Sequence, residues 1–388
     1  MNAPVVRRAP GKFLIAGEYA ALVPGQPAVV AAVDRYVTVT AAPAEHADVE
    51  LVTGPADEPV LLRRGHRGLA PHRSENTSRL RSLSHLLAVL ATVDQLALEL
   101  GLPLTRVRMT VQSDLHERGV KIGAGSSGAV TAAATAALAD FRGLRLTPEA
   151  RLRLALLATL TADPHASGAD VAASTWGGWI RYTGPDREEL HSTRYAHGVA
   201  LTLRARWPGL SLRSMAPPPG PLHVGWTGSP ASTPAQVARL QNTPWWNSEA
   251  HHRFLTDSGH VVDDLAHALD HADQQAATHA LGDARKLLGG LDRQTSIGVF
   301  TPMLTTLCES AEAVGGSGKP SGAGGGDCGI ALLPAHADPR PLHRLWTAAG
   351  ITPLPVRTAP CSAPLEVIGP DPARVLPVVA APTPRTAP

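Results

Sequence analysis

The chain has 388 residues, of which 44% are hydrophobic and 18% charged, and its formal net charge at pH 7 is +2. A chain of this length is longer than one that usually folds around a single hydrophobic core, so we expect a globular protein of two domains. The small net charge and the 4% aromatic content argue against a nucleic-acid-binding surface. No stretch is long and apolar enough to span a bilayer, and the N-terminal residues lack the apolar region of a signal peptide.

The cysteines indicate the redox compartment. Cys308, Cys328 and Cys361 are odd in number and widely spaced, and no CxxC pair occurs. We therefore expect a cytoplasmic protein with neither a disulfide framework nor a zinc site.

The first third of the chain predicts strands and one long helix. Residues 5–40 favour strand, turn and strand, and the polar residues 41–73 favour an extended connection with short strands. Apolar residues at helical spacing predict a helix over 79–100, which Gly101 ends. Alternation predicts a strand at 104–113.

The middle of the chain predicts further elements and a linker. A helix is expected over 146–163, with Pro148 at its first position, followed by a strand in WGGWIRY (176–182). The proline-rich run at 216–222 indicates a linker near a domain boundary, and 249–289 has a helical pattern.

Beyond it we expect a strand in LHVGWTG (222–228), a helix near 301–314, and a glycine-rich loop that leads into a strand. The tail from about 370 is rich in Pro and Ala without periodicity, and we expect it to be poorly ordered.

The stretch KIGAGSSGAVTAAATAAL (121–138) contains GxGxxG, which raises the possibility of a dinucleotide site. A dinucleotide fingerprint follows a buried strand and precedes an acid by about 20 residues. Here the preceding SDLHERGVKI is charged, and Asp140 comes too early, within the helical run. The context therefore argues against a dinucleotide. The Ala and Thr content of the run predicts a helix packed closely on all sides.

The string GKPS (318–321) resembles the end of a Walker P-loop. The pattern GxxxxGK[ST] would require Gly at 313 and Ser or Thr at 320, where this chain has Ala313 and Pro320. We reject the Walker interpretation.

A glycine-rich turn that opens a helix still points several backbone N–H groups toward an anion. Ser126 and Ser127 add hydroxyls for a phosphate oxygen or a magnesium ion, and Lys121 adds a point charge. The second loop, GAGGG (322–326), allows close backbone approach to a ligand. The alternative, that each loop is only a tight turn, is disfavoured because two such loops each have a lysine beside them.

Two charged residues stand in unusual contexts. Only four of the 35 basic residues are lysine, and Lys12, in PGKFLIAGEY, suggests a buried or cleft-lining ammonium. Asp170, in SGAD, lies between small residues and an apolar run. The alternative for Asp170 is a helix N-cap.

Four segments in order resemble the GHMP kinase superfamily: APGKFLIAGEY, KIGAGSSGAV, SGADVAASTWGGW and KPSGAGGGDCGIALL. The strings GEYA, GSSGAVT, ASTWGGWI, GWTGSPAST and GVFTPML resemble the actinobacterial phosphomevalonate kinases within it. The resemblance implies a two-domain α+β kinase fold. Residues 1–200 would form an N-terminal α/β domain with a left-handed-type β-α-β phosphate loop. Residues 201–369 would form a ferredoxin-like domain, and 370–388 a disordered tail.

The resemblance also implies roles for individual residues. Lys12 and Asp170 would be the catalytic pair, and Ser127 the magnesium ligand. Acceptor binding would involve Lys121, His165, Ser167, Gly168 and Ser232. ATP binding would involve Gly123, Ala124, Gly125, Ser126, Ser127, Gly128, Gly322, Ala323 and Gly324.

The implied reaction is phosphoryl transfer from ATP, with Mg²⁺, to the small molecule 5-phosphomevalonate in the mevalonate pathway, with no nucleic-acid or membrane partner. Alternatives are a mevalonate kinase or another small-molecule GHMP kinase, and an inactive kinase-fold metabolite sensor. Whether the protein forms a homodimer is left open by the sequence.

Two positions depart from the family pattern. Thr161 stands where relatives tend to have a glutamate, a candidate second magnesium ligand, which leaves Asp163 as the nearest acid. His165 stands where relatives tend to have a lysine.

Overall fold

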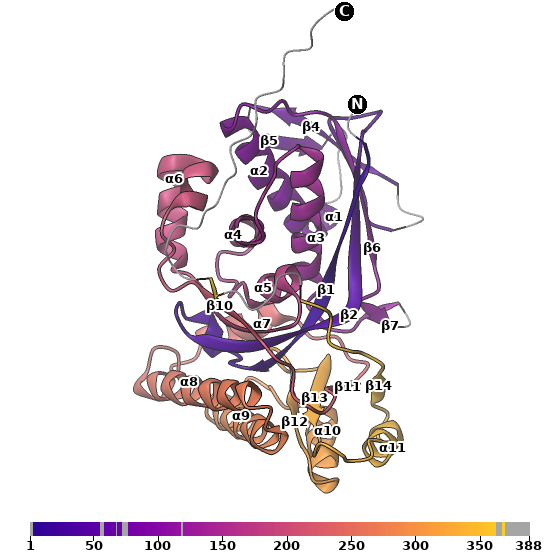
Figure 1. Cartoon of the computed structure of the whole chain (residues 1–388), viewed down its shortest axis with the longest axis vertical. Helices are drawn as coiled ribbons and strands as arrows, with labels where there is room; N and C mark the ends of the chain where they lie inside the picture. Colours follow the sequence, from indigo (N-terminus) through magenta and orange to yellow (C-terminus); the bar gives the residue numbers. More distant parts are fainter. Residues whose placement is uncertain are drawn as a thin grey trace, which may run out of the picture.

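The computed structural model of this chain describes residues 3–54, 58–66, 68–71, 77–117, 119–361 and 367–368. These residues form two large β-sheets with helices packed around them (Figure 1). Within these ranges no helix is both long and apolar enough to cross a membrane. The tail from about 370, predicted to be poorly ordered, lies outside the described residues.

The first sheet is organised around its longest strand, β2 (Pro27–Ala42). One edge of β2 pairs antiparallel with β1 (Val5–Ala16), and its other edge pairs with β9 (Trp179–Thr183) and then β6 (Val107–Ser113). The remaining strands are β3 (Val49–Val52), β4 (Val60–Gly65), β5 (Gly68–Pro71), β10 (Ser211–Met215) and β15 (Val367–Ile368). The predicted strand, turn and strand over 5–40 are thus confirmed.

The second sheet is antiparallel, with the order β12, β13, β11, β14. Its strands are β11 (His223–Trp226), β12 (Ser317–Pro320), β13 (Cys328–Leu332) and β14 (Thr352–Leu354). This order, with helices after β11 and after β13, is that of a ferredoxin-like β-α-β-β-α-β unit. The predicted α+β fold with a ferredoxin-like second part is confirmed.

The change from one sheet to the other occurs across 216–222, the predicted linker, because β10 still pairs with β9 in the first sheet. The division after residue 200 stays a prediction; α6 (Arg187–Arg204) runs through that position. The handedness of the phosphate-loop connection also stays a prediction.

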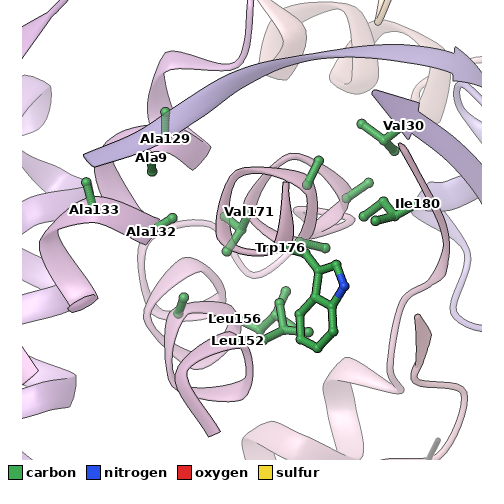
Figure 2. Packing of buried hydrophobic residues seen from close by; sticks show 14 of the residues in the cluster. Ala9, Val30, Ala129, Ala132, Ala133, Leu152, Leu156, Val171, Trp176 and Ile180 are labelled. Carbon is green, nitrogen blue, oxygen red and sulfur yellow. The ribbon is translucent and has the colours of Figure 1, made fainter. Parts of the chain in front are cut away.

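Helices cover one face of the first sheet (Figure 1). They are α1 (Thr77–Ser82), α2 (Ser84–Glu99), α3 (Ser126–Phe141), α4 (Pro148–Ala162) and α5 (Ala169–Trp176). The small residues of α3 allow it to pack directly on β1 and β2, and Figure 2 shows Ala129, Ala132 and Ala133 in this core with Trp176 beside Leu152 and Leu156. The expected close packing of α3 is confirmed, since Ala129, Ala133 and Ala137 are fully buried.

Further helices follow β11 in the chain, and some of them pack against the second sheet. They are α7 (Thr233–Gln241), α8 (Glu249–Asp270), α9 (Gln274–Thr295), α10 (Pro302–Ala313) and α11 (Arg340–Ala348), and a short 3-10 turn, η1 (Ala20–Leu22), follows β1. The antiparallel pair α8 and α9 bridges the two sheets, because α8 contacts β1 and β2 while α9 contacts β12 and β13 (Figure 1). The predicted helical stretch 249–289 is therefore two helices. Ala272, at φ 50°, breaks it, and Asp273 caps α9 by accepting from the N–H of Ala276 (2.9 Å).

Several elements were not expected from the sequence. The mostly polar α6 carries few apolar residues at helical spacing, and Gly198, at φ 78°, kinks it. The loop that begins α3 follows a two-stranded hairpin of β7 (His116–Glu117) and β8 (Val120–Lys121) instead of a buried strand.

A buried ion pair joins the two parts of the fold. The Lys319 ammonium on β12 donates to Glu18, just after β1, and to the carbonyl oxygen of Pro320 (2.7 Å). Lys319 is 0% exposed and Glu18 is 3% exposed. Burial lowers the pKa of Lys319, and the Glu18 carboxylate opposes that effect. The lysine beside the second glycine-rich loop therefore pairs with Glu18 inside the protein.

Loss of one partner is expected to destabilise the protein strongly. Lys319→Met leaves the Glu18 carboxylate buried without its cation, so the free energy of unfolding should fall by about 3–5 kcal/mol in urea denaturation. The double variant Glu18→Leu/Lys319→Met should recover most of that loss. Lys286→Met, at an exposed ion pair with Asp283, is the control and should change stability far less. Equal losses at Lys319 and Lys286 would contradict this account.

Candidate functional site

The N-terminus of α3 has backbone N–H groups that can bind an anion. Gly123 and Gly125 adopt left-handed conformations, with φ values of 73° and 72°, which lets the chain turn sharply into the helix. Gly125 is the N-cap residue, and no side chain of the described chain caps this helix end. The first N–H groups of α3 are therefore available to a ligand. The loop is anchored to β1, because the Lys12 N–H donates to the carbonyl oxygen of Ala124 (2.9 Å).

Two of the predicted charged residues lie against this loop. A Cβ atom at Gly125 would lie 2.7 Å from Cε of Lys12, so the lysine side chain runs across the glycine. A Cβ atom at Gly128 would lie 2.8 Å from Oδ2 of Asp170, which brings α5 onto the first turn of α3. The glycines of GxGxxG thus provide room for Lys12 and Asp170 as well as an open helix end.

Asp327 is a third charged residue at the loop, and the sequence analysis missed it. A Cβ atom at Gly123 would lie 2.6 Å from its Oδ2, and its Oδ1 accepts from the N–H of Ala231 (3.1 Å). Burial raises the pKa of Asp327, whereas the Ala231 N–H and the Lys12 ammonium lower it. The sequence could have identified Asp327 as a candidate site residue, because it directly follows GAGGG, a segment expected to approach phosphates.

Asp170 lies at the start of α5, but it does not cap the helix. The N-cap is Gly168, with φ 78°, where a Cβ atom would meet the Tyr182 hydroxyl at 2.9 Å. Asp170 occupies the first turn and accepts from the N–H of Val171 (2.8 Å). The N-cap interpretation of Asp170 is therefore wrong, and its carboxylate reaches Gly128 at the first turn of α3.

The second glycine-rich loop is tied to the first third of the chain. Ser321 bonds both backbone groups of Leu14 on β1, accepting from its N–H (2.9 Å) and donating to its carbonyl oxygen (3.0 Å). The Tyr19 hydroxyl donates to the carbonyl oxygen of Ala323 (2.5 Å). Gly322 and Gly324 have φ values of 89° and 67°. Both glycine-rich loops are therefore attached by hydrogen bonds to β1 or to the turn that follows it.

The residues expected to bind the acceptor are dispersed around this centre. Ser232 is exposed and caps α7, accepting from the N–H of Ala235 (3.4 Å), while the neighbouring Ala231 contacts Asp327. Ser167 accepts from the N–H of Ala169 (3.3 Å). The exposed residues His165 and Lys121 complete the set.

Arg187 holds the loop that carries His165. Its guanidinium donates to the carbonyl oxygens of His165 (3.2 Å), Ala166 (3.0 Å) and Leu22 (2.5 Å). Burial lowers the pKa of Arg187, and nearby acids including Asp163 oppose that effect. This arginine lies outside the recognised motifs, and only its tertiary contacts connect it to the site.

Thr161, at the family's glutamate position, is engaged elsewhere. Its hydroxyl donates to the carbonyl oxygen of Leu157 (2.8 Å) and accepts from Arg194. The guanidinium places a positive charge at this position, so Thr161 does not replace a metal-binding glutamate. Asp163 remains the acid nearest to position 161 in the chain, and both Asp163 and Asp170 act electrostatically on His85 of α2.

Comparison with known proteins agrees with this arrangement. Residues 87–178 match the family described as "GHMP kinases N terminal domain", and residues 267–349 match "GHMP kinases C terminal". The chain is 45% identical over 363 residues to a phosphomevalonate kinase of Streptomyces sp. strain CL190, covering 92% of this chain and 97% of that protein. It is 27% identical over 336 residues to a mevalonate kinase of Thermococcus sibiricus, covering 85% and 89%.

A solved structure is also similar. The chain superposes on the Streptococcus pneumoniae phosphomevalonate kinase in complex with phosphomevalonate and AMPPNP with a TM-score of 0.77 and 25% identity, covering 91% of this chain and 99% of that one.

Gly123→Ala is expected to destabilise the site through Asp327. An Ala at this position suffers both the left-handed φ of 73° and overlap with the aspartate, so it should lose about 1–3 kcal/mol more unfolding free energy than the control. The control is Gly101→Ala, which has the same φ of 73° but open space around its Cβ. Urea denaturation of both variants measures the difference, and equal losses would show that Asp327 does not constrain this loop.

Proposed function

The chain belongs to the phosphomevalonate kinase family of the GHMP kinases, and we propose that it converts ATP and 5-phosphomevalonate to ADP and 5-diphosphomevalonate. The observation that carries this proposal is the open N-terminus of α3, with Lys12 and Asp170 packed against its glycines. An uncapped helix end holds phosphates, and a lysine beside it offsets their charge.

We propose that the first loop, from Gly123 to Gly128, holds the ATP phosphates through backbone N–H groups and the hydroxyls of Ser126 and Ser127. The second loop, with Gly322, Ala323 and Gly324, closes on the nucleotide from the opposite side. Its attachment to β1 through Ser321 supports this pairing of the two loops.

The acceptor's chemistry determines what Asp170 has to do. The second pKa of a phosphate monoester is about 6, so at pH 7 the acceptor is largely dianionic and needs little help from a base. An oxygen of this phosphate attacks the γ-phosphorus while the bond from the γ-phosphorus to the bridging oxygen of ADP breaks. We propose that Asp170 orients Lys12 and the acceptor, and that the Lys12 ammonium reduces repulsion between the two phosphates.

Magnesium fits the side chains that are present. Within the described ranges no three His, Cys, Asp or Glu side chains cluster as a metal site. Mg²⁺ on nucleotides is usually held by one or two protein oxygens, with phosphates and water supplying the rest. We propose that the exposed Ser127 hydroxyl is one such ligand, and that the carboxylate of Asp170, which packs against the adjacent Gly128, lies beside it. Bound Mg²⁺ would neutralise charge on the transferred group.

The acceptor's own phosphate needs groups beyond those on ATP. We propose Ser167, Gly168 and Ser232 for this role, with Lys121 and His165 as contributors of charge. The attachment of the 229–231 segment to Asp327, next to the first loop, supports the placement of Ser232 near the reacting phosphates.

The choice of acceptor is tested by measuring ADP release with ATP and Mg²⁺. We expect turnover with 5-phosphomevalonate and little or none with mevalonate, because the proposed site would bind the phosphate that only the first acceptor carries. Turnover should stop with EDTA and return with excess Mg²⁺. A preference for mevalonate would support a mevalonate kinase, whereas tight binding of phosphomevalonate without ADP release would support a metabolite sensor.

The roles of the central pair predict unequal losses. Lys12→Met should lower kcat by about 100-fold or more, because it removes a charge that stabilises the transition state. Asp170→Asn should keep substantial activity. Its decrease in kcat should be much smaller than the decrease of about 10²–10⁴-fold expected when a general base is removed. The measurement is kcat over pH 6–9 for wild type and both variants. A steep pH-dependent collapse in Asp170→Asn, absent in wild type, would make Asp170 a base.

A further inference from the structure

His85 is a histidine of α2 beside the phosphate loop. It is partly buried, and its Nδ1 lies 3.3 Å from the hydroxyl oxygen of Thr131 on α3. Thr131 follows Ser127 by four residues, so both lie on the same face of α3, about one turn apart. The Thr131 hydroxyl contacts the carbonyl oxygen of Ser127 at 2.9 Å. The imidazole is thereby held about one helical turn from the open helix end.

The hydrogen-bond chain determines which ring nitrogen is available. The Thr131 hydroxyl has one proton and donates it to Ser127, so it accepts from His85 at Nδ1. Nδ1 therefore carries the proton in the neutral ring, and Nε2 is left as an acceptor. No protein hydrogen bond to Nε2 occurs among the residues that the structure describes. A second proton on the ring would make Nε2 a charged donor.

The charges around the ring come from three other elements. Asp170 of α5, Asp163 after α4 and Lys121 of β8 all act on His85. Burial has the largest effect and lowers the pKa of His85, the two carboxylates raise it, and the lysine lowers it. The free protein thus keeps the ring mostly neutral at pH 7.5, next to the residues expected to handle phosphate.

We propose that His85 binds a phosphate oxygen of one of the two reactants through Nε2, as an imidazolium that gains its proton when the phosphate binds. This inference rests on the proposed function and identifies the source of an additional positive charge that the site requires. A phosphate dianion supplies the electrostatic stabilisation that burial removes, so binding and proton uptake are coupled. The alternative is that His85 only braces α2 against α3 through Thr131.

Calorimetry separates these two roles. Binding of AMPPNP with Mg²⁺, and separately of 5-phosphomevalonate, is measured at pH 7.5 in two buffers of different ionisation enthalpy. Wild type should take up protons with one of the two ligands. His85→Gln should lose that uptake and weaken the same ligand's binding by about 10-fold or more, as expected for a lost charge-assisted hydrogen bond. The ligand affected identifies the source of the phosphate.

Two further variants complete the experiment. His85→Arg, which is charged at every pH, should restore affinity without proton uptake, a result that a bracing role does not predict. His260→Gln, on the exposed side of α8, is the matched control and should bind like wild type. Unchanged affinity and proton uptake in a folded His85→Gln protein would overturn the inference alone. Failure of wild type to bind either compound would overturn the proposed function as well.

Discussion

The buried ion pair between Glu18 and Lys319 is the constraint on which the arrangement of the site depends. Charges withdrawn from water are strongly destabilising unless they are paired, so the end of β1 and the start of the second glycine-rich loop must meet at one point. The Gly322 N–H also approaches Glu18 (3.4 Å). The pair thus fixes how the ferredoxin-like sheet presents its loop to the rest of the kinase.

Strand β1 extends this constraint to both loops. Its Lys12 backbone holds the first loop at Ala124, and its Leu14 backbone is bonded by Ser321 of the second loop. The same strand carries the Lys12 side chain, which runs across Gly125 of the first loop. A single rigid strand therefore sets the spacing of the two loops and the position of the ammonium, which a reaction that depends on positioning requires.

Three acids near this centre show how a site for two polyanions can contain negative charge. Asp170 packs against Gly128 and Asp327 packs against Gly123. Asp163 lies in the segment between α4 and α5, where it accepts from the N–H of His165. Each lies in the field of a cation or a histidine: Lys12 acts on Asp327, and Asp163 and Asp170 act on His85. The carboxylates can thus orient positive groups toward the phosphates instead of meeting the phosphates directly.

The sequence by itself determined the local features: the glycine-rich turns, the long helix that follows GAGSSG, the main strands, and Lys12 and Asp170 as charges in unusual contexts. These follow from backbone rules that act over a few residues. Only the tertiary structure decided that Lys319 is a buried partner of Glu18 and that Arg194 donates a hydrogen bond to the Thr161 hydroxyl. It also decided that Asp327 and His85 lie close to the candidate site. The partners of these side chains are tens to hundreds of residues distant in the chain. Their roles therefore depend on packing, which no local pattern encodes.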